Sequence, residues 1–267
     1  MKRPVKIILF TFFAVVFLMC ALKLVFVMQE YKEGVDVYEE LNLNYVSTPD
    51  VSPETEVPTA DSPSVGEDPA PAETPVVISA PVTVDFDSLL SINPDVVGWL
   101  YCENTEINLP VVQADDNSYY LNRLINGAYN SSGTLFLDYR VPSDFSGKNS
   151  IIYGHNMKNK TMFGNLDAYM EQSYYDEHPV MYLLTPEQNY MVELFSGYET
   201  DPYSATFTFE FENADSFARH LEEAKAMSVF QSDVEVTPED SILTLSTCTD
   251  NNSYMRFVLI GRLVPIE

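Results

Sequence analysis

The hydrophobic and polar positions of this chain define three regions with different patterns. Residues 7–28 form a continuous apolar run that only Lys23 interrupts. Residues 29–81 are mostly polar, acidic and rich in proline. From residue 82 onward, short apolar runs alternate with polar turns, as in a folded domain. The pattern therefore predicts a membrane segment in residues 1–28, an extended stalk in residues 29–81 and a folded domain in residues 82–267.

The first region has the length of a membrane-spanning helix. About 20 apolar residues at a rise of 1.5 Å match a bilayer core of roughly 30 Å. Lys2, Arg3 and Lys6 precede the run, which favours a cytoplasmic N-terminus. A cleaved signal peptide is the alternative, but it needs a shorter apolar core and a small-residue cleavage site, and residues 25–28 provide none. We therefore expect an uncleaved anchor, with the rest of the chain outside the cell.

The second region has the composition of a spacer. Between Glu30 and Glu73, twelve acidic residues face one basic residue, Lys32, and eight prolines lie between Pro49 and Pro81. Such a segment buries too little apolar surface to offset the entropy of ordering it. Proline-rich chains of this kind are semi-rigid and extended. We expect a stalk, the first part of which is able to continue the membrane helix for a few turns.

The third region contains many short strands and few helices. Strands are expected at residues 96–101, 107–112, 133–139, 149–153, 180–184, 190–196, 242–245 and 257–260. Helices are expected at residues 85–91, 161–176 and 213–230, with a further short one capped by residues 115–117. This pattern predicts a mainly β fold, a closed barrel of about eight strands with peripheral helices, because closure removes exposed strand edges. The long helix precedes the strand that ends at Cys248.

Charge and cysteine content exclude several functions. The formal net charge of −26 excludes nucleic acid as a partner, since the chain cannot neutralise phosphates. Three cysteines, Cys20, Cys102 and Cys248, are too few and odd in number for a disulfide framework. There is no CxxC pair and no zinc-ligand spacing. We therefore expect no metal site and no cofactor.

A cysteine and an arginine stand at the facing ends of the last two predicted strands. Residues 242–245 lead to Cys248, and Arg256 opens the run 257–260. Adjacent strands would hold a thiol and a guanidinium side by side at the lip of a sheet. The thiol can act as a nucleophile, and a fixed cation can stabilise the oxyanion that forms when it attacks a carbonyl. This stretch lacks a base.

Three histidines are candidates for that base. His220 lies among charged residues in the long predicted helix and is interpreted as a surface residue. His178 lies in a turn before a strand and has no distinguishing context. His155 follows a predicted strand and Gly154. An imidazole at a glycine bend after a buried strand is placed like a site residue, the alternative being a loop histidine without a chemical role.

The order of these residues resembles that of a known family. The sequence TLSTC at residues 244–248, with an arginine eight residues later and YGH at residues 153–155, resembles the sortases of Gram-positive bacteria, and class B sortases in particular. Further similarity covers residues 97–113, 116–121, 133–138 and the helix at 213–230, which matches an insertion typical of class B. The resemblance extends over about residues 83–263 and implies a sortase-type barrel.

The resemblance also implies catalytic roles. Cys248 matches the nucleophile, His155 the general acid/base and Arg256 the stabiliser of oxyanion and substrate. Arg262 is a rival for the last role but lies farther from the cysteine, so we favour Arg256. Asp250 matches a position discussed as an orienting partner, and a loop or capping role is its alternative.

Other positions match residues that bind substrate in class B sortases. Those expected to line the sorting-peptide groove are Asn117, Leu121, Tyr153, Ser246, Thr200 and Tyr203. Trp99, Tyr120 and Phe136 are instead expected in the core. Cys102 has no arginine or histidine beside it in the sequence and is expected to be a buried, non-catalytic residue.

The family's activity implies a transpeptidation in two steps. The enzyme would cleave a C-terminal sorting signal of a surface protein after threonine, form a thioester on Cys248 and transfer the protein to an amine of a cell-wall peptidoglycan precursor. The recognised motif stays open between NPxTN and (S/N)PxTG types. A pilus-polymerising sortase that uses a pilin lysine and a thiol hydrolase are the alternatives, and the joint presence of cysteine, histidine and arginine argues against a non-catalytic binding module. The predicted location is the cell membrane, with one span and an extracellular catalytic domain.

Overall fold

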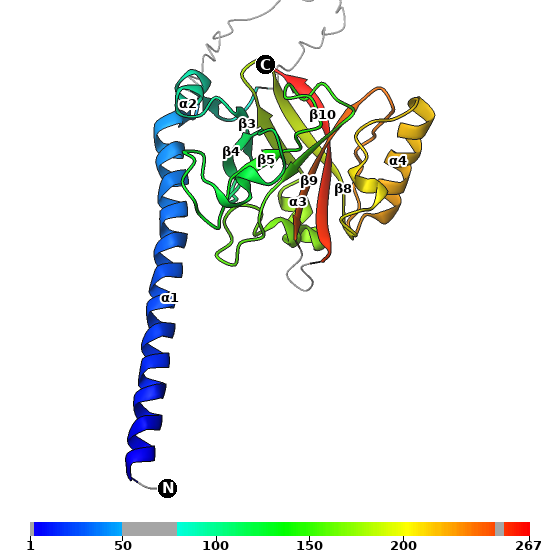
Figure 1. Cartoon of the computed structure of the whole chain (residues 1–267). Helices are drawn as coiled ribbons and strands as arrows, with labels where there is room; N and C mark the ends of the chain where they lie inside the picture. Colours follow the sequence, from blue (N-terminus) through cyan, green and yellow to red (C-terminus); the bar gives the residue numbers. More distant parts are fainter. Residues whose placement is uncertain (1–2, 50–78, 249–253) are drawn as a thin grey trace, which may run out of the picture.

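A closed β-barrel is the main body of the molecule (Figure 1). The computed structural model describes residues 3–49, 79–248 and 254–267. The barrel strands follow the order β10-β8-β7-β3-β4-β5-β6-β9. Their bounds are β3 (Val96–Tyr101), β4 (Asn108–Val112), β5 (Leu135–Leu137), β6 (Asn149–Tyr153), β7 (Val180–Leu184), β8 (Asn189–Thr200), β9 (Ser241–Cys248) and β10 (Arg256–Ile266). The predicted mainly β barrel of eight strands is confirmed.

The barrel is mixed in strand direction. β4 pairs with β5, and β6 with β9, in parallel, while the remaining neighbours are antiparallel. Its interior is filled by fully buried side chains, among them Trp99, Leu100, Leu183, Leu245 and Leu259. Close packing of this kind fixes the strand ends against each other. The ends of β6 and β9 therefore form a rigid support for the residues that follow them.

Short helices lie outside the barrel. α2 (Phe86–Ile92) begins at the predicted cap Asp85, whose carboxylate accepts a hydrogen bond from the Ser88 N–H at 3.0 Å. η1 (Tyr119–Asn122), η2 (Leu166–Met170), α3 (Gln172–Glu177) and η3 (Ala205–Phe207) are single turns in loops. α4 (Ala214–Met227) begins with a capping box between Asn213 and Ser216 and packs on β8.

The prediction that His220 is a surface residue is wrong. His220 is 6% exposed and lies with Phe217 and Leu221 on the buried face of α4. The ring of Phe211, which precedes the helix, packs against His220 at 5.1 Å. Burial lowers the pKa of this histidine, because the charged form loses hydration. The charged neighbours in sequence occupy the opposite face of the helix.

Helix α1 (Arg3–Tyr45) continues from the apolar run into the region expected to form the stalk. Among the described residues it is the one helix long and apolar enough to cross a membrane. Its C-terminal part contacts the barrel, with Tyr38 and Leu41 buried. β1 (Val46–Ser47) then pairs with β2 (Thr83–Val84). Residues 29–47 are thus helix and strand, and the proline-rich residues 50–78 lie outside the described part.

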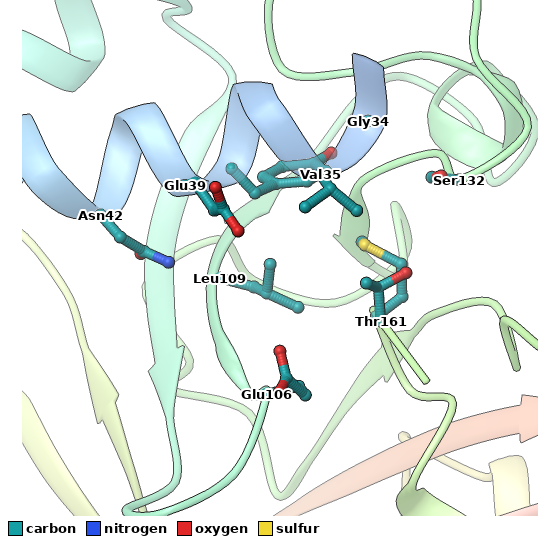
Figure 2. Close-up of a pocket in the computed structure, with 10 residues that line it drawn as sticks. Gly34, Val35, Glu39, Asn42, Glu106, Leu109, Ser132 and Thr161 are labelled. Carbon is teal, nitrogen blue, oxygen red and sulfur yellow. The ribbon is translucent and has the colours of Figure 1, made fainter. Parts of the chain in front are cut away.

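The contact between α1 and the barrel leaves a small pocket (Figure 2). Glu39 and Asn42 of α1, Glu106 and Leu109 of the barrel and Ser132 lie around a space of about 70 Å³. On the same side of α1, a Cβ atom at Gly34 would lie 2.8 Å from the Ser132 hydroxyl oxygen. Glycine at this position therefore permits the close approach of helix and barrel.

Candidate active site

Strand register brings the predicted catalytic positions together at one end of the barrel. β6 and β9 are parallel, and Tyr153 lies beside Ser246. His155 lies two residues after Tyr153, and Cys248 lies two residues after Ser246. Because the two strands are parallel, both positions lie at the same edge of the sheet. β10 returns antiparallel to β9 and pairs Arg256 with Cys248. Residues that are far apart in the sequence thus become neighbours through one parallel and one antiparallel pairing.

This edge of the sheet lies at the end of the barrel toward which the N-terminal half of α1 extends. β10 begins at Arg256 and ends near the C-terminus of the chain. Figure 1 shows the C-terminus at the end of the barrel opposite to that direction, and the start of β10 at the near end. The candidate site therefore lies at the end of the barrel from which the N-terminal half of α1 projects.

His155 is half-buried and held by a main-chain contact. Its Nε2 lies 2.6 Å from the carbonyl oxygen of Leu121. Because a carbonyl can only accept, Nε2 must carry a proton and donate it. In the neutral ring, Nδ1 is then the nitrogen with a free lone pair. This arrangement leaves Nδ1 as the atom that can take up and release a proton.

A groove of about 450 Å³ lies over these strand ends. Of the residues expected to form it, the lining includes His155, Arg256, Asn117, Leu121, Tyr153, Ser246 and Tyr203. Gly154, Pro202, Phe207 and Thr247 line it too and were not singled out from the sequence. The hydroxyls of Ser246 and Thr247 are buried and make no hydrogen bond within the described residues.

Phe136 belongs both to the core and to the groove. It is 5% exposed, as expected for a core residue, and it also lines the groove. Its ring lies 5.4 Å from that of Tyr153, which is in turn stacked on Phe207 at 6.3 Å. The groove floor is therefore a row of aromatic rings. From the sequence alone, an apolar strand residue buried in the barrel core cannot be distinguished from one that lines the groove.

A buried carboxylate lies beneath this floor. Asp138 is 0% exposed, and its oxygens accept bonds from Arg140 Nε at 2.8 Å and Arg140 Nη2 at 2.6 Å. The Tyr153 hydroxyl donates to the same carboxylate at 3.1 Å. Burial by itself raises the pKa of Asp138, but the hydrogen bonds from Arg140 and Asn117 lower it below its usual value. The ionised carboxylate thus connects two groove residues, Tyr153 and Asn117.

The aspartate was missed because its role depends on tertiary contacts. In sequence it ends the apolar run LFL and is followed by Tyr139 and Arg140, a pattern shared with ordinary strand ends. The sequence feature that could have indicated its role is a carboxylate directly after a buried strand, with an arginine two residues later.

Other predicted site residues have different surroundings. Thr200 pairs with Arg256 across β8 and β10, but within the described residues it does not line the groove. Its hydroxyl donates to the Ser204 hydroxyl at 2.8 Å. Asp250 lies outside the described residues. Thr200 is therefore a neighbour of Arg256 on the sheet, and its role in binding substrate stays a prediction.

The two alternatives for cysteine and arginine lie elsewhere. Arg262 donates from Nε to a Glu193 carboxylate oxygen at 2.8 Å, six strand positions or about 20 Å from Arg256. Cys102 is 1% exposed, with its sulfur 3.8 Å from the Tyr169 hydroxyl. Burial raises the pKa of the Cys102 thiol and so suppresses the reactive thiolate. The expectation of a buried Cys102 is confirmed.

Comparisons with known proteins assign this barrel and its groove to a family. The model of the sortase domain family matches residues 100–264. Sortase B of Listeria monocytogenes serovar 1/2a is 38% identical over 189 residues, which are 70% of this chain and 77% of that protein. The chain therefore belongs to the sortase family and, within it, to class B.

Solved structures agree with this assignment. Sortase B from Bacillus anthracis in complex with AAEK1 matches with a TM-score of 0.71 and 30% identity, over 89% of this chain and 99% of that one. A Staphylococcus aureus sortase B–substrate complex matches with a TM-score of 0.65 and 35% identity, over 68% of this chain and 85% of that one. The fold and the enzyme class agree with those that the sequence motifs predict.

Proposed function

We propose that this sortase cleaves a C-terminal sorting signal after threonine, forms a thioester on Cys248 and transfers the surface protein to a peptidoglycan amine. The observation that carries the proposal is the strand register, which pairs Arg256 with Cys248 and sets Tyr153 beside Ser246. His155 and Arg256 both line the groove over these strand ends. The substrate complex of a sortase B with the same fold supports a peptide-binding role for the groove.

His155 acts as the acid and base of both steps. The thiol is a weak nucleophile and must lose its proton, which Nδ1 of His155 can accept. The Nε2–H bond to Leu121 keeps the ring in one tautomer during this exchange. The imidazolium then protonates the departing amine of the sorting signal. The peptide bond after threonine breaks as the thioester bond forms.

Arg256 stabilises the charge that develops on the carbonyl oxygen. Its position opposite Cys248 on the neighbouring strand places a cation at the groove. Loss of one such donor typically lowers the rate by about 10²–10³-fold. In the second step, a neutral acceptor amine attacks the thioester, His155 takes up the amine's proton, and the thiolate leaves. His155 then returns the proton to the Cys248 sulfur, so the product contains a new amide bond and the enzyme is back in its starting state.

α1 serves as the membrane anchor in this proposal. Its apolar side chains are exposed, from Val5 at 48% to Met28 at 64%. The basic residues that precede the run favour a cytoplasmic N-terminus. The barrel then lies outside the cell, where surface proteins and peptidoglycan precursors are found. Asp250 is kept as a proposed orienting residue.

The test uses the full chain in detergent micelles with peptides of the NPxTN and (S/N)PxTG types. We expect mass spectrometry to detect an acyl adduct on Cys248 and, after addition of an amine, an amide product. Cys248→Ala should abolish the adduct, whereas the matched control Cys102→Ala should retain it. The reverse result would overturn the assignment of the nucleophile. Exclusive hydrolysis with amine present would identify a thiol hydrolase, and a response to lysine-bearing pilin peptides alone would identify a pilus-polymerising enzyme.

A further inference from the structure

The distance between the membrane run and the barrel is set by one unbroken helix. The apolar run of α1 ends at Met28, and Glu30 follows two residues later. Two residues of α-helix correspond to about 3 Å along the axis. The polar headgroup layer of a bilayer is roughly 5–8 Å thick on each side. Glu30 therefore lies at the level of the headgroups when α1 spans a membrane.

The barrel is bonded to α1 at that same level. The side-chain amide of Asn130 donates to the Glu30 carbonyl oxygen at 2.8 Å. The Ser131 N–H donates to the Glu30 carboxylate, also at 2.8 Å. Further along the helix, the buried Tyr38 bonds to Gly133 and Thr134. These four contacts hold the loop at residues 123–134 against the helix, and the two at Glu30 lie closest to the membrane surface, about 12 Å along the axis from the two at Tyr38.

Two exposed tyrosines and a half-buried arginine, whose Nη1 donates to the Gly127 carbonyl, lie on this loop and on η1 just before it. Tyr129 is 71% exposed and Tyr119 is 45% exposed. Arg123 lies between them: its guanidinium is 4.8 Å from the centre of the Tyr119 ring, and its backbone pairs with that of Tyr129. We name Tyr119, Arg123 and Tyr129 the tyrosine patch. Tyrosine is favoured in the headgroup layer, where its ring is apolar and its hydroxyl is wet, and arginine binds phosphate.

We propose that the tyrosine patch docks on the headgroup layer of the bilayer that α1 crosses. The inference rests on α1 being the anchor of the proposed function. The patch is continuous with the groove, because Leu121, which lies between Tyr119 and Arg123, lines the groove and accepts the His155 bond. Docking would hold one wall of the active site at the membrane surface, with the groove opening beside the lipid.

The experiment uses the full chain in vesicles of phosphatidylcholine and phosphatidylglycerol that contain a headgroup spin-labelled lipid. Tyr129→Trp supplies a fluorophore in the patch. The matched control is Glu267→Trp, at the exposed C-terminus on the opposite end of the barrel (Figure 1). The native Trp99, which is 0% exposed inside the barrel, gives the background signal. We expect the lipid label to quench the Tyr129→Trp variant at least threefold more than the Glu267→Trp variant.

Each outcome has a separate meaning. Equal quenching of the two variants in protein that floats with the vesicles would overturn docking of the patch while leaving the anchor intact. Failure of the parent chain to float with vesicles would overturn the anchor and the docking with it. The peptide acylation assay on the same samples reports independently on the proposed chemistry. The same comparison of Tyr129→Trp with Glu267→Trp is repeated in a Tyr119→Ser/Arg123→Ser background. Loss of the difference in quenching would show that the whole tyrosine patch takes part in docking. An unchanged difference would mean that Tyr129 alone forms the docking site.

Discussion

The Asp138 carboxylate shows how one buried charge can shape the groove. It is bonded on one side to Arg140 and on the other to Tyr153, whose ring forms part of the groove floor. Hydrogen bonds to a charged group contribute about 1.5–3 kcal/mol each when both partners are well placed. The Arg140 side chain is 43% exposed, so water screens part of this interaction. The aspartate is thus a positioning residue behind the groove.

We predict that Asp138→Asn lowers the free energy of unfolding by about 1–3 kcal/mol and raises KM for the sorting peptide about tenfold. The amide keeps the shape of the side chain but loses its charge, so Tyr153 loses a fixed acceptor. kcat should change less than KM, because the residue touches no reacting atom. Urea titration and steady-state kinetics measure the two effects. Asp144→Asn, which removes an exposed carboxylate bonded to Ser146, is the control; equal effects of the two substitutions would contradict the positioning role.

The same variant has a predicted pH dependence. The pKa of Asp138 is lower in the folded state than the ordinary value of about 3.9. Its stabilising contribution is therefore complete above that value and is lost as the pH falls through the folded-state pKa. As the pH falls below about 4, the parent protein should lose stability more steeply than Asp138→Asn. Parallel slopes in acid titrations of the two proteins would refute this.

The positions of single residues were predictable where a sequence motif includes them. They were not predictable where contacts with distant side chains determine burial. His155 and Arg256 line the groove as their motifs indicate. His220 was misplaced because its neighbours in sequence are charged, whereas the side chains that cover it come from Phe211 and Phe217. Thr200 lies on β8, beyond the strand expected at residues 190–196, because β8 continues in pairing with β10. The hydrophobic pattern of the sequence does not reveal the contacts between aromatic rings that decide whether a residue such as His220 is buried.

At the scale of elements, strand positions and the pairing of the last two strands were predictable, whereas the pairing of strands distant in sequence was not. Hydrophobic runs located all eight barrel strands, although β8 and β10 extend beyond their apolar runs because each supplies the other with backbone partners. The parallel pairing of β6 with β9, which creates the site, joins segments some ninety residues apart. Nothing in the local alternation of either strand specifies that neighbour. The resemblance to a family supplied what the periodicity could not.

The bend after β6 depends on Gly154. A Cβ atom there would lie 2.4 Å from a Leu135 methyl carbon and 2.6 Å from the Phe163 ring. We predict that Gly154→Ala destabilises the fold by about 1–3 kcal/mol and displaces His155, lowering kcat/KM at least tenfold. Thermal unfolding and peptide kinetics measure both effects. Gly147→Ala, whose nearest contact would be 3.3 Å, is the matched control. Parent-like kinetics in Gly154→Ala would exclude a need for glycine at this bend.

At the scale of the whole molecule, the C-terminal part of α1 packs on the barrel, while its N-terminal part is long and apolar enough to cross a membrane. Composition predicted residues 29–81 as a spacer, because acidic and polar residues outnumber apolar ones. A few apolar positions are enough to dock a helix when they share one face, and Tyr38 and Leu41 lie on that face. The docked helix contacts Gly133, which packs against the Leu121 carbonyl that binds His155. Helix α1 and the groove that His155 lines are therefore linked through one loop.

This link predicts that Tyr38→Ala loosens both the helix and the active site. The substitution removes a buried ring and its hydrogen bonds to Gly133 and Thr134, which should weaken docking by about 3 kcal/mol. Lys32 is the one basic residue of residues 29–81, so trypsin cleavage after Lys32 reports on undocking of α1. In detergent micelles we expect cleavage to accelerate about 100-fold and kcat/KM to fall, since a 3 kcal/mol change shifts the docking equilibrium by roughly that factor. The control is Leu43→Ala, which alters an 84% exposed residue of the same helix. It should leave both the cleavage rate and kcat/KM unchanged. Faster cleavage with unaltered kinetics would mean that α1 docks without supporting His155, whereas unaltered cleavage would mean that Tyr38 does not hold the helix.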